Sequence, residues 1–215
     1  MEGPEPVGSP LAPPPKPRPL VAVASRLSRT AFRYGNRWFV VPLHRAGLAA
    51  WLGSPLAGCQ LLLTTTGRRS GLPRDTPLGY LVAEGAAWVV AGYGPSTLWY
   101  RNLLEDPRGV VRLPARLPFA AVAVPVHDPV VRARIIPRLV RSMPLPGCMI
   151  GTNVWTATDE RILQLVNWVP LVRIAPVEGR LIAGADDPGG HGWVWRQAVV
   201  TLVAVAAFGI GRRRR

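Results

Sequence analysis

A short segment rich in glycine and arginine carries the residue types best suited to binding an anion. Gly67 and Gly71 flank Arg68, Arg69 and Ser70 in the run GRRSG, directly after the apolar stretch LLLTTT. Glycine permits positive φ, so the segment predicts a tight turn between two strands. Two guanidinium groups, a serine hydroxyl and consecutive backbone N–H groups can then converge on one anion.

Arg74 follows three residues after the turn and would begin the returning strand. It adds a third guanidinium group near the same point, so the pattern favours a socket for phosphate or carboxylate groups. The competing interpretation is a solvated hairpin turn whose arginines face water. For an isolated GRRSG the solvated turn is favoured, and the longer sequence context has to decide.

The composition is compatible with either interpretation. The chain has 215 residues, of which 48% are hydrophobic and 18% charged, enough for one folded core with extensions. Its formal net charge of +14 comes almost wholly from arginine, since Lys16 is the only lysine. Such a bias suits an anionic ligand, and it also arises from a GC-rich genome.

Other catalytic chemistries have no support in the sequence. Cys59 and Cys148 lie in apolar surroundings, which favours two buried thiols. The histidines, His44, His127 and His191, have no ligand spacing, so we expect no metal site. A G-x-S-x-G elbow, a promising pair of carboxylates and a cysteine beside a histidine are all missing, which argues against nucleophilic catalysis.

The periodicity predicts a mainly β domain with flanking helices. Residues 1–19 are proline-rich and are expected to be disordered, and residues 20–53 predict two short amphipathic helices interrupted at Pro42. Strands are expected at residues 60–66, 76–82, 87–92, 109–113, 119–126 and 171–174. Helices are expected at residues 98–104, at 129–141 after the N-cap Asp128, and at 159–167. About six strands with helices outside can curl into a small closed or half-closed barrel.

The C-terminal segment has a different character. Residues 177–192 are expected to be a linker, and residues 193–215 an apolar and basic tail in which residues 198–210 carry no charge and Arg212–Arg215 follow. One interpretation is a helix that docks on the surface of an anionic membrane. The alternative is a frayed extension or a helix packed on a partner subunit. No secretory signal precedes the fold, so we expect a cytoplasmic protein, peripheral at the inner face of the membrane.

The longer context of the arginine turn resembles the deazaflavin-dependent nitroreductase and quinone reductase family. The family pattern TTxGRKSG-x-x-R-x-x-PL is matched at Thr65, Thr66, Gly67, Arg68, Arg69, Ser70, Gly71, Arg74, Pro77 and Leu78. The resemblance continues at Val89, Val90, Ala91, Gly92, Tyr93 and Gly94, at Trp99, Tyr100, Asn102 and Leu103, at Asp106-Pro107 and at residues 170–176. The usual His-Pro before the tryptophan is replaced by Ser96, Thr97 and Leu98.

The resemblance implies a split β-barrel of the flavin reductase or FMN-binding type over residues 20–176. It implies hydride transfer from the reduced deazaflavin coenzyme F-420 to a quinone or nitro compound. The turn would hold the phosphate and oligoglutamate tail, and the AGYG segment would approach the ring. The implied coenzyme-binding residues are Thr65, Thr66, Arg68, Arg69, Ser70, Arg74, Thr76, Pro77, Leu78, Gly79, Tyr80, Ala91, Gly92, Tyr93, Gly94, Leu98, Trp99, Tyr100 and Asn102. Tyr93 and Tyr100 are candidates for the proton donor.

Rival functions remain at this point. The barrel could bind FMN or haem instead, or carry the coenzyme without catalysis. A basic nucleic-acid-binding protein is disfavoured, since no recognisable module interleaves aromatic and basic residues on one face. Relatives of this barrel often pair, so a homodimer is expected.

Overall fold

The computed structural model describes residues 35–51, 53, 58–114, 116–143, 147, 151–183, 195, 198–200 and 202–203. The expected disordered segment at residues 1–19, most of the linker and tail, and Cys148 lie outside the described residues.

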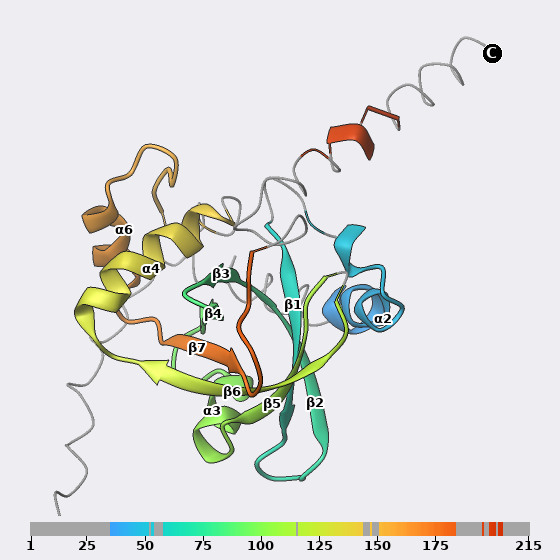
Figure 1. Ribbon diagram of the computed structural model, residues 1–215. Helices are drawn as coiled ribbons and strands as arrows, with labels where there is room; N and C mark the ends of the chain where they lie inside the picture. Colours follow the sequence, from blue (N-terminus) through green and yellow to red (C-terminus); the bar gives the residue numbers. More distant parts are fainter. Residues whose placement is uncertain are drawn as a thin grey trace, which may run out of the picture.

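Seven antiparallel strands form one curled sheet. They are β1 (Gln60–Thr66), β2 (Pro73–Gly79), β3 (Leu81–Ala83), β4 (Ala86–Val90), β5 (Arg108–Arg112), β6 (Phe119–Val126) and β7 (Leu171–Pro176). Their order in the sheet is β2-β1-β5-β6-β7-β4-β3. The two outermost strands, β2 and β3, are consecutive in the chain and are separated only by Tyr80. The two ends of the sheet are therefore one extended segment, and the sheet wraps around on itself (Figure 1).

Strict alternation of side chains across Tyr80 explains this closure. Tyr80 and Val82 belong to the interior cluster, whereas Leu81 and Ala83 belong to a second cluster on the outer face. Successive side chains on a strand point to opposite faces, so the segment continues as one strand through Tyr80. The interior cluster draws small and branched residues from every side of the barrel, among them Leu61, Leu63, Val89, Val111, Ala121, Ala123, Val172 and Ile174.

Two amphipathic helices cover the outer face of β3, β4 and β7. Helices α4 (Pro129–Arg141) and α6 (Asp159–Val166) pack with Leu81, Trp88 and Leu171 in the second cluster. The expected N-cap of α4 is confirmed, because the Asp128 carboxylate accepts a hydrogen bond of 2.8 Å from the Val130 N–H. In Figure 1 both helices lie on the side of the barrel opposite α2.

The N-terminal helices correct one expectation. The π-helical turn η1 (Asn36–Val40) runs directly into α2 (Val41–Arg45), and the 3-10 turn η2 (Ala49–Trp51) follows. Pro42 does not interrupt the helix as predicted, because it lies in the first turn of α2, where the missing N–H costs little.

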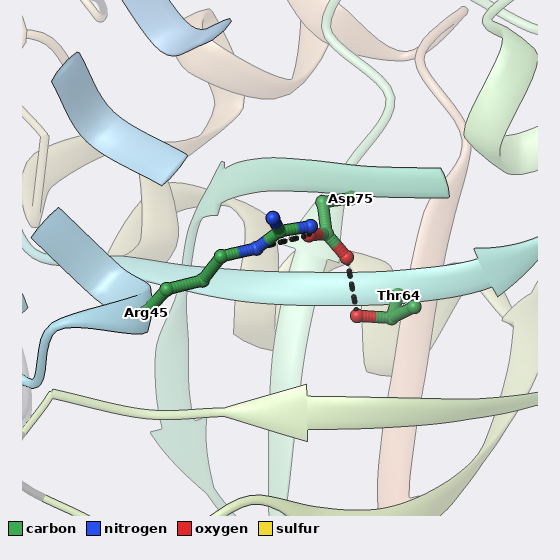
Figure 2. A network of polar contacts seen from close by, with 3 residues as sticks. All are labelled: Arg45, Thr64 and Asp75. Carbon is green, nitrogen blue, oxygen red and sulfur yellow. Dashed lines mark hydrogen bonds and ion pairs between the residues drawn. The ribbon is translucent and has the colours of Figure 1, made fainter. Parts of the chain in front are cut away.

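One polar network ties α2 to the sheet. Arg45 donates to Asp75 on β2 with an Nη2–Oδ2 distance of 2.6 Å, and Thr64 on β1 donates to the other oxygen of the same carboxylate at 2.6 Å (Figure 2). Thr64 and Asp75 are register partners, so the network also joins the two strands of the hairpin that carries the arginine turn.

Helix α3 (Leu98–Glu105) completes the interior. Its side chains Trp99, Tyr100 and Leu103 are buried in the same cluster as the barrel strands. The prediction of a mainly antiparallel curled sheet with flanking helices is confirmed.

Candidate functional site

The arginine turn joins β1 to β2 and is held rigidly. Thr65 pairs with Arg74 and Thr66 with Pro73, and the Gly67 N–H donates to the Leu72 carbonyl at 2.9 Å. Gly71 has a φ of +64°. This φ favours glycine at position 71, whereas a Cβ on Gly67 would lie 2.8 Å from the Ser70 hydroxyl and 3.0 Å from the Leu72 carbonyl oxygen, so a larger residue there would need these groups to shift.

The backbone donors of this turn differ from the expectation. The N–H groups of Gly67, Ser70 and Gly71 donate to carbonyls within the turn, with distances of 2.7 to 3.0 Å. The Arg68 N–H donates to the Asn102 side-chain oxygen at 3.3 Å. These donors are therefore used to build the turn, and an anion bound here has to be recognised chiefly by side chains.

Among the described residues, the guanidinium groups of the turn have no carboxylate partner. Arg69 and Arg74 are exposed and Arg68 is half-buried. Within the described ranges, ion pairs are formed by Arg45, Arg108, Arg134 and Arg141, and none by the three arginines of the turn. Arg74 Nη2 lies 3.5 Å from the Ser70 hydroxyl, to which it donates. Three uncompensated positive charges thus lie within one hairpin.

Asn102 fastens this turn to α3. Besides accepting from the Arg68 N–H, its Nδ2 donates to the Thr65 hydroxyl at 3.1 Å. Asn102 is 7% exposed and Thr65 is 1% exposed, so water cannot readily replace either bond.

The second predicted segment, Ala91–Gly94, forms another tight turn at the end of β4. The Gly94 N–H donates to the Ala91 carbonyl at 2.6 Å, and Gly94 has a φ of +82°. A Cβ built on Gly92 would have no neighbour within 4 Å, so the backbone there borders open space. A flat ligand can approach such a backbone closely.

Helix α3 joins the two turns. At its start, the Thr97 N–H and hydroxyl both donate to the Gly94 carbonyl, the hydroxyl at 2.6 Å. One turn further along, Asn102 holds the arginine turn. The structure thus brings together segments that the sequence separates, and it gives Thr97, which replaces a residue of the family pattern, a defined role in positioning.

The predicted residues further along β2 lie apart from the turn. Tyr80 is fully buried in the barrel interior. Pro77 pairs with Leu62 on the outer face, and a Cβ on Gly79 would collide with Met143 after α4. Thr76 and Leu78 are half-buried on the interior side of the strand. The exposed Thr66 and Ser70 lie at the turn itself.

The aromatic candidates differ in exposure. Trp99 and Tyr100 are each 5% exposed and meet edge to face, with centroids 6.1 Å apart. Burial raises the pKa of Tyr100, and the nearby positive charge of Arg132 partly opposes that rise. The Tyr100 hydroxyl therefore stays protonated across the neutral range. Leu98 and Tyr93 are exposed beside these residues.

Sequence reasoning missed Arg132 on α4. Its guanidinium group is buried and donates to three backbone carbonyls, those of Val126, Asn167 and Val169. No local sequence signal distinguishes it from the exposed arginines of the same helix. No group of three or more histidine, cysteine, aspartate or glutamate side chains suited to a metal occurs among the described residues.

A basic turn with no carboxylate of its own, a glycine turn beside open space and a curled antiparallel barrel suit a protein that binds a flat, anionic ligand. Residues 40–146 match the family model described as F420H(2)-dependent quinone reductase, which confirms the resemblance seen in the sequence. The predictions of coenzyme F-420 and of an F-420-dependent oxidoreductase are thereby confirmed.

Solved structures with partial similarity include the conserved hypothetical protein Rv2991 from Mycobacterium tuberculosis, with 23% identity over 55% of this chain and 73% of that one and a TM-score of 0.42. The F420-H2 dependent reductase FDR-A is 21% identical over 54% of this chain and 92% of that one, with a TM-score of 0.39. The heme storage protein HutZ from Vibrio cholerae is 18% identical over 57% and 84%, with a TM-score of 0.40. No activity is carried over from these three structures.

Proposed function

We propose that this protein transfers a hydride from reduced coenzyme F-420 to a small hydrophobic acceptor, a quinone or a nitro compound. The observation that carries the proposal is the set of three guanidinium groups, those of Arg68, Arg69 and Arg74, without carboxylate partners around a rigid turn. Buried or paired arginines are common, whereas a cluster left unpaired on a tightly built hairpin suits a polyanionic ligand tail. Residues 20–176 form the coenzyme-binding unit of this proposal.

The ring of the coenzyme would lie between the Ala91–Gly94 turn and α3. Gly92 leaves the backbone open to a flat ligand, and the exposed Leu98 offers apolar surface beside it, while Trp99 and Tyr100 are buried next to Leu98 at the start of α3. When bound, the coenzyme supplies the hydride. The barrel orients its ring, excludes water and leaves one face for the acceptor.

A proton has to reach many such acceptors after hydride transfer, and Tyr100 and Tyr93 are the proposed donors. Because burial raises the pKa of Tyr100, its O–H remains available at neutral pH. The exposed part of Tyr93 lies in the turn that borders the ring.

Replacing Arg68 or Arg74 with alanine tests the proposal. Each substitution removes a charge-assisted contact worth about 1.5–3 kcal/mol, so the affinity for F-420 should fall by roughly tenfold to a hundredfold. Fluorescence titration of the deazaflavin at low salt measures that affinity.

The matched control is Arg138→Ala, which removes an exposed arginine of α4 and the same unit of net charge. It should leave the affinity within about twofold, since an exposed charge remote from the ligand is screened. Wild-type affinity in both Arg68→Ala and Arg74→Ala would reject the anion site. Wild-type protein that binds FMN or haem but no deazaflavin would reject the coenzyme.

We also propose that residues 193–215 bind an anionic membrane surface peripherally, on the inner face of the membrane. Trp195, Val199, Leu202 and Val203 are all exposed at positions spaced as one helical stripe. Arg212–Arg215 follow in the sequence and suit anionic headgroups. Within the described ranges, no helix is both long and apolar enough to cross a bilayer.

Co-sedimentation with vesicles containing anionic lipid tests the tail. The full chain should sediment with them, and a chain ending at residue 191 should stay in the supernatant. Replacing the four terminal arginines with glutamine should give intermediate binding, because the apolar stripe remains. Equal sedimentation of the full and shortened chains would end the membrane proposal.

The assembly state included in this proposal is a homodimer. Val110 on β5 and Val124 on β6 are exposed on the outer face of the sheet and offer apolar area to a second copy. Sedimentation velocity measures the state directly.

A further inference from the structure

The Ala91–Gly94 turn is held from behind by the connection between α6 and β7. The Ala91 N–H donates to the Pro170 carbonyl at 3.0 Å, and Ala91 is fully buried. Two residues earlier in that connection, Trp168 packs on the turn itself. A Cβ built on Gly94 would lie 2.9 Å from Trp168 Cζ3, so the indole ring is already in close contact with the backbone there.

Trp168 is itself fixed in place. Its indole N–H donates to the Leu165 carbonyl at the end of α6 at 3.1 Å, and its ring is half-buried beside the outer cluster. The ring therefore has little freedom to withdraw from Gly94.

Arg132 braces the same connection from α4. Its Nη2 donates to the Asn167 carbonyl at 2.9 Å and to the Val169 carbonyl at 3.0 Å, on either side of Trp168. Its Nη1 lies 3.4 Å from the Val126 carbonyl at the end of β6. Arg132 is 5% exposed, and in the described part of the chain it forms no ion pair with a carboxylate.

Burying a guanidinium group without a counter-charge carries a large desolvation cost. The planar arrangement of its N–H donors lets Arg132 hydrogen-bond to three carbonyls at once. Lysine has one rotatable ammonium group and cannot reproduce that bridge. These bonds hold residues 167 and 169, and Trp168 between them lies against the proposed ring-binding turn.

We infer that Arg132 and Trp168 are positioning residues, which fix the Ala91–Gly94 turn at the distance from α3 that the coenzyme ring requires. The inference rests on the proposed function for its ligand, and on the contacts above for its geometry. Neither side chain touches the ligand. Both act through the backbone of the turn.

Amide hydrogen exchange in the coenzyme-free protein tests the positioning itself. In Arg132→Lys and in Trp168→Leu, the N–H groups of Ala91 and Gly94 should exchange at least about tenfold faster than in the wild type, because local opening becomes easier. The matched controls are Arg134→Lys, an exposed neighbour on α4, and Trp155→Leu, an exposed tryptophan, and both should keep wild-type exchange at these amides. Unchanged exchange in the two test variants would overturn the inference.

Coenzyme binding tests the consequence for the ring. With F-420 bound, the same two variants should lower kcat by about tenfold to a hundredfold, as expected for a small misplacement of reacting groups, and should shift the visible absorption of the bound ring. The affinity, which depends on the arginine turn, should change much less. Faster exchange combined with a wild-type kcat and wild-type absorption would also overturn the inference.

A double variant distinguishes direct contact between Gly94 and Trp168 from a general loss of structure. Gly94→Ala should slow the reaction, because its Cβ meets the indole ring and its φ of +82° strains alanine. Combining it with Trp168→Leu should recover part of the loss, since the steric part is relieved and the backbone strain remains. Strictly additive losses would contradict direct contact between the two residues.

The outcome also separates this inference from the proposed function. If the wild-type protein binds no deazaflavin, the proposed function fails and the exchange experiment still decides the role of Arg132 and Trp168 in holding the turn. If it binds and turns over normally while the variants behave as the controls, the inference alone fails.

Discussion

His44 is buried in surroundings that leave its ring nitrogens unsatisfied. Its ring on α2 is fully buried, and neither ring nitrogen has a hydrogen-bond partner. Desolvation by burial and, to a smaller extent, the positive charge of Arg112 together lower its pKa from 6.5 to about 4. The ring is therefore neutral in the folded protein at pH 7.

This burial makes stability depend on pH. Between pH 6.5 and about 4 the unfolded chain protonates His44 and the folded chain resists it, so folding stability falls as the pH falls through that window. The contribution lost between pH 6.5 and pH 5 is roughly 2 kcal/mol. Urea denaturation at pH 7 and pH 5 measures it, and His44→Leu should lose less stability over that interval than the wild type. An identical pH dependence in the two proteins would contradict the assignment to His44.

Individual residues of the candidate site differ in how far the sequence predicts their roles. The basic turn could be predicted from Gly67, Gly71 and the arginines between them, because the tendency to form a turn depends on residues adjacent in the sequence. Arg132 gives no such signal, since its partners lie up to 37 residues away in the chain. The backbone donors were misjudged for the same reason, because only the structure shows that Asn102 uses the Arg68 N–H.

At the scale of elements, α3 is the connector on which both turns depend. Asn102→Ala should leave the Thr65 hydroxyl and the Arg68 N–H without their partner, and should lower the free energy of unfolding by about 1–3 kcal/mol. It should also weaken F-420 binding, because the arginine turn is no longer fixed to the helix. Thermal melts and coenzyme titration measure the two effects.

Asn102→Asp provides the comparison within the same position. It keeps an oxygen that can accept from the Arg68 N–H and loses the donor to Thr65, so its coenzyme affinity should lie between those of alanine and wild type. The control is Glu105→Ala, an exposed position of the same helix, which should alter neither quantity. Equal F-420 affinities for the wild type and Asn102→Ala would show that coenzyme binding does not require the hydrogen bonds from Asn102 to the arginine turn.

The elements themselves were largely predictable where periodicity is strong. Strands β1 and β6 have the predicted bounds, and α4 begins after the predicted cap Asp128. The interruption at Pro42 was wrong, because helix continuity there depends on a π-helical turn that the pattern of apolar residues does not show. The extended segment through Tyr80 was predicted only from residue 76 onward, since Arg74 and Asp75 carry no strand signal.

At the scale of the whole molecule, net charge should govern coenzyme capture. The chain carries +14 formal charges, and the coenzyme tail is a chain of carboxylates joined to a phosphate. Long-range attraction is screened by salt, so raising the ionic strength from about 0.01 to 0.15 M should weaken F-420 binding markedly. The KM for an uncharged quinone should change little.

Titrations at several salt concentrations measure this difference directly. The salt dependence should be shallower in an Arg68→Ala, Arg74→Ala double variant, because fewer guanidinium groups meet the tail. A coenzyme affinity that does not respond to salt would show that the positive charge of the chain takes no part in binding.

Strand β7 determines when the sheet can close during synthesis of the chain. It fills the gap between β6 and β4, yet it is the last of the described strands to be synthesised, and residues 127–170 separate it from β6. Until Leu171–Pro176 have left the ribosome, β4 and β6 each present an unpaired apolar edge to the solvent. A ribosome that stalls before Leu171 would thus release a chain prone to aggregation, and chaperone demand should drop sharply once that short strand can insert.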